Sequence, residues 1–267
     1  MDTRELAEHL TYAVGLVESA DAIALRYFRQ DAKVEDKSDG GSFDPVTCAD
    51  REVEAFLRGA LIERFPGYGI VGEEEGGLVA EPSKPSWVID PIDGTRAFIS
   101  GMPAWGILLG LVEGDVSRAG AMRQPYTDET FFGTPQGSWF KHEGEQVPLN
   151  TRATLDVASA ILYCTHPSMF VEGGHRQAFE RVAAESRMLR YGGDCYSYCL
   201  LAMGQIDLVI EDSLQPYDIV PLIPIIEGAG GVVTNADGGP ATGGGFIVAA
   251  ATERLHAQTI AIINAND

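Results

Sequence analysis

The chain has 267 residues, 45% of them hydrophobic, enough to bury the core of one large domain or of two smaller ones sharing an interface. Its 19 basic and 39 acidic residues give a formal net charge of -20, which disfavours nucleic acid and anionic membranes as partners. Four scattered cysteines are too few for a secreted disulfide framework, and the polar, acidic start is unlike a signal peptide. We therefore expect a cytoplasmic protein.

The first half of the chain is expected to contain helices followed by strands. Apolar residues recur every three or four positions over residues 4–30, which predicts one long helix, and the same spacing returns over residues 49–65. Short apolar runs predict strands at residues 67–70 and 86–90, and four more between residues 104 and 142. Between these groups, residues 95–100 are expected to form a short helix.

The second half shows a different pattern. A polar stretch at residues 149–156 is interpreted as a connection, and beyond it strand-like and helix-like segments alternate to the end of the chain. Such alternation favours an α/β layer. We therefore divide the chain into an N-terminal α+β half, residues 1–148, and a C-terminal α/β half, residues 149–267.

The motif "DPIDGT", residues 90–95, places two carboxylates at the end of an apolar strand. Pro91 fixes its own φ and turns the chain, so that Asp93 can return to the side of Asp90. Two close carboxylates repel each other unless a cation lies between them, and oxygen ligands suit magnesium. Gly94 allows the backbone to approach a ligand closely. The alternative is that both aspartates only end the strand and cap the next turn.

Two other acidic positions bear on this choice. The run "VGEEEGG" places Glu73 after a short apolar strand, whereas its third acid, Glu75, is better explained by a solvated acidic turn. Asp218 precedes an apolar, helix-like run, where a first-turn aspartate is the ordinary explanation. If these acids share a pocket with the first motif, a cation is needed there.

Together the motifs resemble the inositol monophosphatase family of magnesium-dependent, lithium-sensitive phosphatases. The signatures "DPVTCAD", "GEE", "DPIDGT" and "YDIVPLIPIIEGAGG" occur in the family's order and at its approximate spacing over nearly the whole chain. The resemblance implies a layered α/β/α/β/α sandwich and a homodimer. Within the family, "DPIDGTRAFISGMP", "YGGDCYSYCLLAMGQIDLVIE" and "LQPYD" are most similar to histidinol-phosphate phosphatases, which act in histidine biosynthesis.

The resemblance also implies roles for the matching positions. The expected ligands of two or three magnesium ions are carboxylates and one backbone carbonyl: Glu73, Asp90, Asp93 and Asp218, with the carbonyl of Ile92. The amides of Gly94 and Thr95 would hold the phosphate. Asp50, with Thr95 and Glu73, would orient and deprotonate the attacking water, without a covalent phosphoenzyme. Asp44 would lie behind the ligands or bind a loosely held extra ion.

Substrate selection requires other residues. Histidinol phosphate carries an amine and an imidazole, so acceptors are needed away from the metal. Asp194 and Glu211 match family positions near the leaving group and could bind the amine, although Asp194 after two glycines is also a good helix N-cap. Arg96 is either an anion contact or a member of a surface ion pair. The tyrosines of the second half, Tyr191, Tyr196, Tyr198 and Tyr217, could face the imidazole, but most are expected to serve packing.

Three hypotheses remain open at this point. The chain could hydrolyse histidinol phosphate, it could hydrolyse inositol phosphate, a sugar phosphate or a phosphoadenosine nucleotide by the same mechanism, or it could bind metal or phosphate as an inactive regulatory homologue. A zinc site of Cys164, His166, Cys195 and Cys199 can be imagined, but we expect buried, reduced thiols. No G-x-S-x-G elbow, Walker loop or dinucleotide fingerprint supports another enzyme class.

Overall fold

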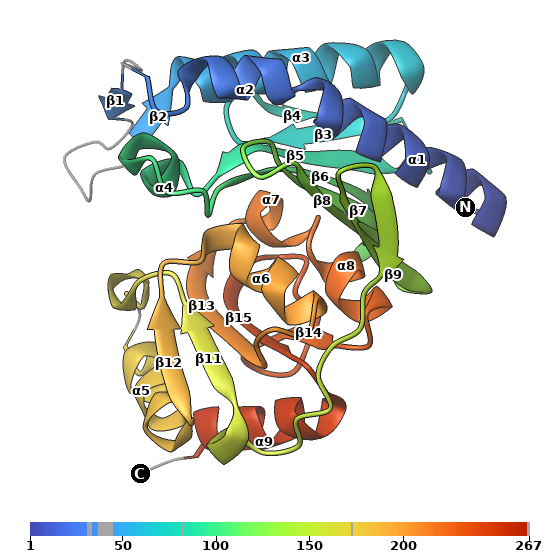
Figure 1. Ribbon diagram of the computed structural model, residues 1–267. Helices are drawn as coiled ribbons and strands as arrows, with labels where there is room; N and C mark the ends of the chain where they lie inside the picture. The colour runs from blue at the N-terminus through green and yellow to red at the C-terminus, as the bar shows by residue number, and fades with distance from the viewer. Residues whose placement is uncertain (31–33, 37–44, 82, 172, 266–267) are drawn as a thin grey trace.

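The computed structural model describes residues 1–30, 34–36, 45–81, 83–171 and 173–265. Helices and two sheets alternate in five layers, which confirms the expected α/β/α/β/α sandwich (Figure 1). The outer helices at the top are α1, α2 and α3; α6, α7 and α8 lie between the sheets; α5 and α9 cover the far face of the second sheet. None of the described helices is both long and apolar enough to span a bilayer.

The N-terminal helices are α1 (Thr3–Ser19), α2 (Asp21–Tyr27) and α3 (Cys48–Arg64). The prediction of one long helix over residues 4–30 is wrong, because the chain ends α1 at Ala20. There the backbone N–H bonds to the carbonyls of Val17 and Glu18 instead of continuing the regular ladder. Asp21 then begins α2, and its carboxylate accepts a 2.9 Å hydrogen bond from Arg123 of the sheet below. This partly buried ion pair gives the break a tertiary cause that cannot be inferred from helical periodicity.

The large sheet has eight strands in the order β10-β9-β8-β7-β6-β5-β3-β4, and a separate ribbon pairs β1 (Val34–Asp36) with β2 (Pro45–Thr47). Only β3 and β5 are parallel neighbours in the large sheet. Every residue of the two edge strands, β4 and β10, is exposed, and both strands lack the apolar pattern by which the others were predicted. The strands are β3 (Gly69–Gly72), β4 (Gly76–Leu78), β5 (Ser86–Asp93), β6 (Gly106–Glu113), β7 (Val116–Gln124), β8 (Glu129–Thr134), β9 (Gly137–His142) and β10 (Glu145–Pro148).

The second sheet has the order β12-β11-β13-β15-β14, with β11 parallel to both of its neighbours. Its strands are β11 (Ile161–Cys164), β12 (Met188–Tyr191), β13 (Leu208–Leu214), β14 (Val232–Asn235) and β15 (Gly245–Ala250). The helices of this half are α5 (His175–Glu185), α6 (Asp194–Ala202), α7 (Pro216–Ile219), α8 (Ile223–Gly228) and α9 (Glu253–Ile263), with short 3-10 turns at Val157–Ser159 and Pro167–Met169. The alternation predicted for this half is therefore present.

The middle helices pack closely against the large sheet. Gly110 in β6 and Gly120 in β7 face Pro221, and a Cβ atom added at Gly120 would lie 1.8 Å from the Pro221 carbonyl oxygen. The Ser117 hydroxyl donates to the neighbouring Val220 carbonyl at 2.7 Å. These contacts hold the connection between α7 and α8 on the sheet, and they split the helix-like run after residue 217 into two short helices. Because α7 ends just before this connection, the sheet also fixes the place of α7.

Candidate active site

The end of β5 brings Asp90 and Asp93 to one side of the sheet. In a regular strand, residues three apart point to opposite faces, but the pairing of β5 with β6 shifts register between these two aspartates. Asp90 is buried, and its Oδ1 accepts a 3.1 Å hydrogen bond from the Ile92 N–H. Asp93 Oδ1 accepts a 2.8 Å hydrogen bond from the Cys195 N–H at the start of α6. The irregularity around Pro91 thus has the effect that the sequence predicts for it.

The third carboxylate comes from α7, far along the chain. Asp218 forms a capping box with Gln215, whose backbone N–H donates to Asp218 Oδ2 at 2.7 Å. Asp90, Asp93 and Asp218 each present one oxygen, and these oxygens all lie within 4.8 Å of one another. Asp218 is therefore a first-turn aspartate and a member of the acidic cluster at once.

Burial and mutual repulsion disfavour ionisation of all three groups. Desolvation raises the pKa of Asp93 to about 7, with a further contribution from the charge of Asp218, and burial raises the pKa of Asp218 to about 7 as well. The pKa of Asp90 is raised well above its usual value by burial and then by the charge of Glu73. A divalent cation would relieve this repulsion, and an all-oxygen donor set suits magnesium or manganese. The residues present therefore fit the expected metal.

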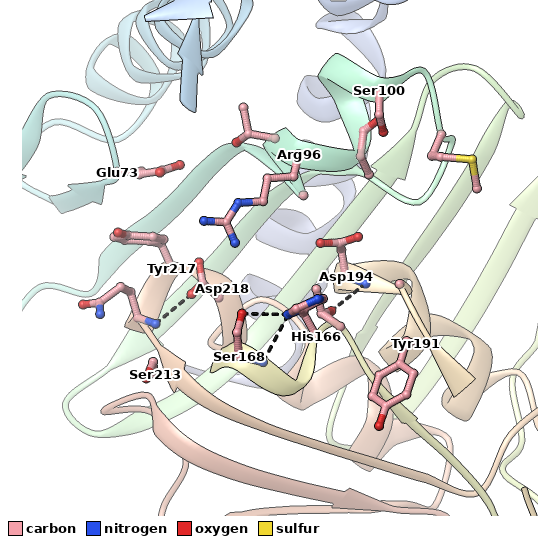
Figure 2. Close-up of a pocket in the computed structure, with 17 residues that line it drawn as sticks. Glu73, Arg96, Ser100, His166, Ser168, Tyr191, Asp194, Ser213, Tyr217 and Asp218 are labelled. Atoms are coloured by element: carbon pink, nitrogen blue, oxygen red, sulfur yellow. Dashed lines mark hydrogen bonds between the residues drawn. The ribbon is translucent and has the colours of Figure 1, made fainter. Parts of the chain in front are cut away.

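Glu73 follows β3 directly and lines the same cavity as Asp218. Figure 2 shows Glu73, Tyr217 and Asp218 toward one end of this cavity and Tyr191 toward the other. The charge of Glu73 also acts on Asp90, as the pKa of that aspartate indicates. Glu73 is not among the three carboxylates whose oxygens lie within 4.8 Å of one another, so the role as a metal ligand that the resemblance implies for it stays a prediction.

Asp50 and Thr95 form a second pair beside the carboxylates. Asp50 is buried in the first turn of α3, where its Oδ2 accepts hydrogen bonds from the Thr47 N–H at 2.9 Å and the Thr47 hydroxyl at 2.6 Å. Its Oδ1 lies 3.5 Å from the Thr95 hydroxyl, which is also 3.2 Å from the Ile92 carbonyl. Thr47 therefore holds Asp50 Oδ2 in place, while Asp50 Oδ1 faces the Thr95 hydroxyl. The family resemblance implies that this hydroxyl helps to orient the attacking water.

Gly94 connects β5 to α4 (Thr95–Ser100), the short helix that the sequence predicts. Its φ of +81° is left-handed, and a Cβ atom there would lie 3.0 Å from the Cβ of Asp194. Glycine therefore lets this turn pass against the start of α6. Gly94 and Thr95 both line the cavity, as a phosphate-holding turn must.

The main cavity has a volume of about 1010 Å³. A smaller one of about 130 Å³ adjoins it, since both are lined by Thr165, Asp194 and Asp218. The small cavity also contains Glu211 and Asp93. A group bound next to the carboxylate cluster would therefore have two further acids within this shared space.

Glu211 and Asp194 differ in how they are held. Glu211 is buried, and its two oxygens accept hydrogen bonds from the Thr165 N–H at 2.7 Å and the Tyr198 hydroxyl at 3.0 Å. Burial raises its pKa. Asp194 is the first residue of α6, after Gly193 at the N-cap position, so the alternative that Asp194 caps this helix is wrong. Burial, and then the charge of Asp93, raises the pKa of Asp194 to about 8.

Arg96 reaches into the cavity from α4, and its positive charge offsets only a small part of the rise in the pKa of Asp194 (Figure 2). Five polar residues of the cavity wall were not predicted as site residues: Ser100, Thr165, Ser168, Ser213 and Gln215. His166, considered only as a zinc ligand, also lines the cavity, and its Nδ1 accepts a 3.1 Å hydrogen bond from the Ser168 N–H. His166 could have been predicted as a site residue from its position after the parallel strand β11, because ligands bind at the carboxyl ends of such strands.

The cysteines behave as expected. Cys164, Cys195 and Cys199 are free and buried, and among the described residues the only group arranged to hold a metal is the aspartate cluster. Two of the tyrosines, Tyr191 and Tyr217, line the main cavity, whereas Tyr198 is buried and Tyr196 donates to Glu129 at 2.6 Å. Asp44 lies outside the described residues.

Comparison with known proteins identifies the family. The model of the inositol monophosphatase family matches residues 5–267. The chain belongs to the inositol monophosphatase family. It is 31% identical over 261 residues to a histidinol-phosphatase of Mycobacterium tuberculosis, covering 97% of this chain and 98% of that protein.

Two further relatives agree with this assignment. The chloroplastic bifunctional phosphatase IMPL2 of Arabidopsis thaliana is 39% identical over 229 residues, which span 85% of this chain but 64% of the plant protein. The structure of an inositol monophosphatase from Zymomonas mobilis superposes with a TM-score of 0.84 at 31% identity, covering 99% of this chain and all of the other. Family and fold together show that this family member is a phosphatase, a hydrolase of phosphoric monoesters.

Proposed function

We propose that the protein hydrolyses L-histidinol phosphate to L-histidinol and phosphate, a step of histidine biosynthesis, with magnesium as its cofactor. The observation that carries this proposal is the pair of additional acids, Asp194 and Glu211, beside the aspartate cluster. An amine on the leaving group supplies a cation for these buried carboxylates to bind, whereas a simple polyol phosphate supplies none. Relatives named histidinol-phosphatase support the same substrate.

The mechanism assigns separate tasks to the residues around the ester. Bound magnesium supplies a water of lowered pKa and neutralises phosphate charge. Glu73, Asp90, Asp93 and Asp218, with the Ile92 carbonyl, would hold it. Asp50 takes up the proton of the attacking water through the Thr95 hydroxyl, which lies 3.5 Å from Asp50 Oδ1 and lines the cavity.

The remaining residues bind and orient the ester. The backbone amides of Gly94 and Thr95 face the phosphate, and Arg96 adds a positive charge on the same side of the cavity. Asp194 accepts hydrogen bonds from the substrate ammonium, with Glu211 behind it. This arrangement aligns the leaving oxygen away from the attacking water, as an in-line displacement at phosphorus requires.

Phosphate release from a panel of esters tests the proposal. L-histidinol phosphate, inositol 1-phosphate, fructose 1,6-bisphosphate and phosphoadenosine phosphate are compared at equal concentration with magnesium, and again with a chelator. We expect a strong preference for histidinol phosphate that the chelator abolishes. Chelator-sensitive activity spread over the other esters would retain the metal site and overturn the substrate. Lithium inhibition and a homodimer, which the resemblance implies, stay predictions for the same preparation.

A further inference from the structure

A buried glutamate on α3 binds the turn that follows Glu73. Glu54 lies one helical turn after Asp50, and its side chain is 0% exposed. Its two oxygens accept hydrogen bonds from the Glu74 N–H at 2.7 Å and the Glu75 N–H at 3.0 Å. The backbone immediately after the expected metal ligand is therefore attached to α3 by a carboxylate that no part of the proposed mechanism uses.

Arg58, one turn further along α3, completes this attachment. Its Nη2 donates to Glu54 at 2.7 Å and to the Gly76 carbonyl at 2.8 Å, at the far end of the same turn. Its Nε also forms an ion pair with Glu75 at 3.3 Å. The guanidinium thus neutralises the buried carboxylate and holds the turn from its other side.

The same Glu54 carboxylate also limits the space at Gly72, the residue before Glu73. A Cβ atom at Gly72 would lie 2.2 Å from Glu54 Oε1 and 2.8 Å from Arg58 Nη2. Only glycine leaves room for the carboxylate at this distance. Glu73 therefore lies between two backbone positions, Gly72 and Glu74, that both contact Glu54.

We propose that Glu54, supported by Arg58, is a positioning residue that fixes Glu73 for metal binding. The inference rests on the role of Glu73 in the proposed function. A carboxylate is required because two amide N–H groups and a guanidinium all donate, and a carboxylate only accepts. Glutamine would turn an NH₂ group toward one of these donors and release that part of the turn.

Metal binding to the chelator-treated protein tests this role directly. Mn²⁺ affinity is measured by isothermal titration calorimetry for the wild type, Glu54→Gln, Glu54→Asp and Glu73→Gln. We expect Glu54→Gln to weaken Mn²⁺ binding by about 10- to 100-fold, as loss of groups that orient metal ligands does. Glu54→Asp, which keeps an acceptor-only group, should recover part of that affinity. Saturating magnesium should also restore the turnover of Glu54→Gln, because Glu73 itself is still present.

Asp207 provides a matched control in the other half of the molecule. It is likewise 0% exposed, and it accepts hydrogen bonds from the Ile161 N–H at 2.8 Å and the Thr154 hydroxyl at 2.6 Å, beside Arg152. Asp207→Asn should lower the free energy of unfolding in urea while leaving Mn²⁺ affinity unchanged. This variant separates the general effect of removing a buried carboxylate from the specific effect of losing the group that positions Glu73.

The outcomes distinguish the positioning role of Glu54 from the metal-binding role of Glu73. If Glu54→Gln unfolds more easily but binds Mn²⁺ with wild-type affinity, the positioning role is overturned. Unchanged affinity in Glu73→Gln would instead overturn the metal assignment of the proposed function. If Glu54→Gln does not fold, Arg58→Lys decides the matter, because it keeps the charge but loses the fork that reaches Gly76; wild-type Mn²⁺ affinity there would reject the inference.

Discussion

Asp93 joins the end of β5 to the start of α6 through the hydrogen bond from the Cys195 N–H. One of its oxygens also belongs to the cluster with Asp90 and Asp218. The side chain therefore has two roles in the proposed function, which are to accept the hydrogen bond from Cys195 and to bind metal. An amide oxygen can accept the hydrogen bond, whereas metal binding requires the charge of a carboxylate.

We predict that Asp93→Asn lowers kcat by more than about 100-fold and weakens Mn²⁺ binding, because a charged ligand is lost. The asparagine oxygen still accepts from Cys195, so the circular dichroism spectrum should not change. Removing one of three repelling carboxylates should also leave the metal-free protein at least as stable to urea at neutral pH. Near-normal turnover in this variant would reject the metal assignment of the cluster.

Asp194 and Glu211 allow the substrate to be tested by substitution. Asp194→Asn and Glu211→Gln should each raise KM for histidinol phosphate by about 10- to 100-fold, the value of a hydrogen bond to a charged group. Phenyl phosphate lacks an amine, so its hydrolysis should change little in either variant. Equal losses on both esters would remove the substituted residue from substrate selection. Glu8→Gln, which alters an exposed acid of α1, serves as the control.

At the scale of elements, local patterns predicted more of the large sheet than of the turns around it. The strand beginning at Ser86 and the helix at residues 95–100 follow from apolar runs and the glycine between them, although the strand runs three residues past the predicted end, to Asp93. The break at Ala20 does not, because it depends on the pairing of Asp21 with Arg123, a contact across the fold. The exposed strands β4 and β10 have no apolar face from which they could be predicted.

The candidate site divides in the same way. Asp90 and Asp93 could be derived from one motif, whereas Asp218 joined them only through family resemblance, because its own neighbourhood indicates a helix start. Glu54 was not predicted at all. Its helical position and its charge are ordinary, and its role depends on the turn after Glu73, which belongs to another element.

Packing of the middle layer on the large sheet gives an element-scale prediction. Gly120→Ala would place a methyl group against the Pro221 carbonyl, so we expect the free energy of unfolding to fall by about 1–3 kcal/mol, as overpacking does. The displaced connection follows α7, so Mn²⁺ affinity should fall as well. Urea unfolding and calorimetry measure the two effects. Gly15→Ala, in an exposed helical position with open space, should instead add about 0.5–1 kcal/mol; equal effects of both changes would contradict the packing argument.

At the scale of the whole molecule, the acidic cluster links folding, pH and metal. Burial and repulsion raise the pKa of Asp93 and Asp218 from 3.8 to about 7, and that of Asp90 shifts in the same direction. Between these values the folded protein binds more protons than the unfolded chain. The free energy of unfolding contributed by the cluster therefore falls as pH rises above about 4, and it continues to fall as pH passes 7.

Magnesium should reverse this loss, because it binds the ionised carboxylates and binds only the folded protein. We predict that Tm in chelator falls between about pH 5 and pH 8, and that magnesium raises Tm far more at pH 8 than at pH 5. Differential scanning calorimetry at constant ionic strength measures both. Other groups titrate over this range, so Asp93→Asn is the comparison: its Tm in chelator should depend less on pH, and its response to magnesium should be smaller. A magnesium shift as large at pH 5 as at pH 8 would show that ionisation of this cluster does not control metal binding.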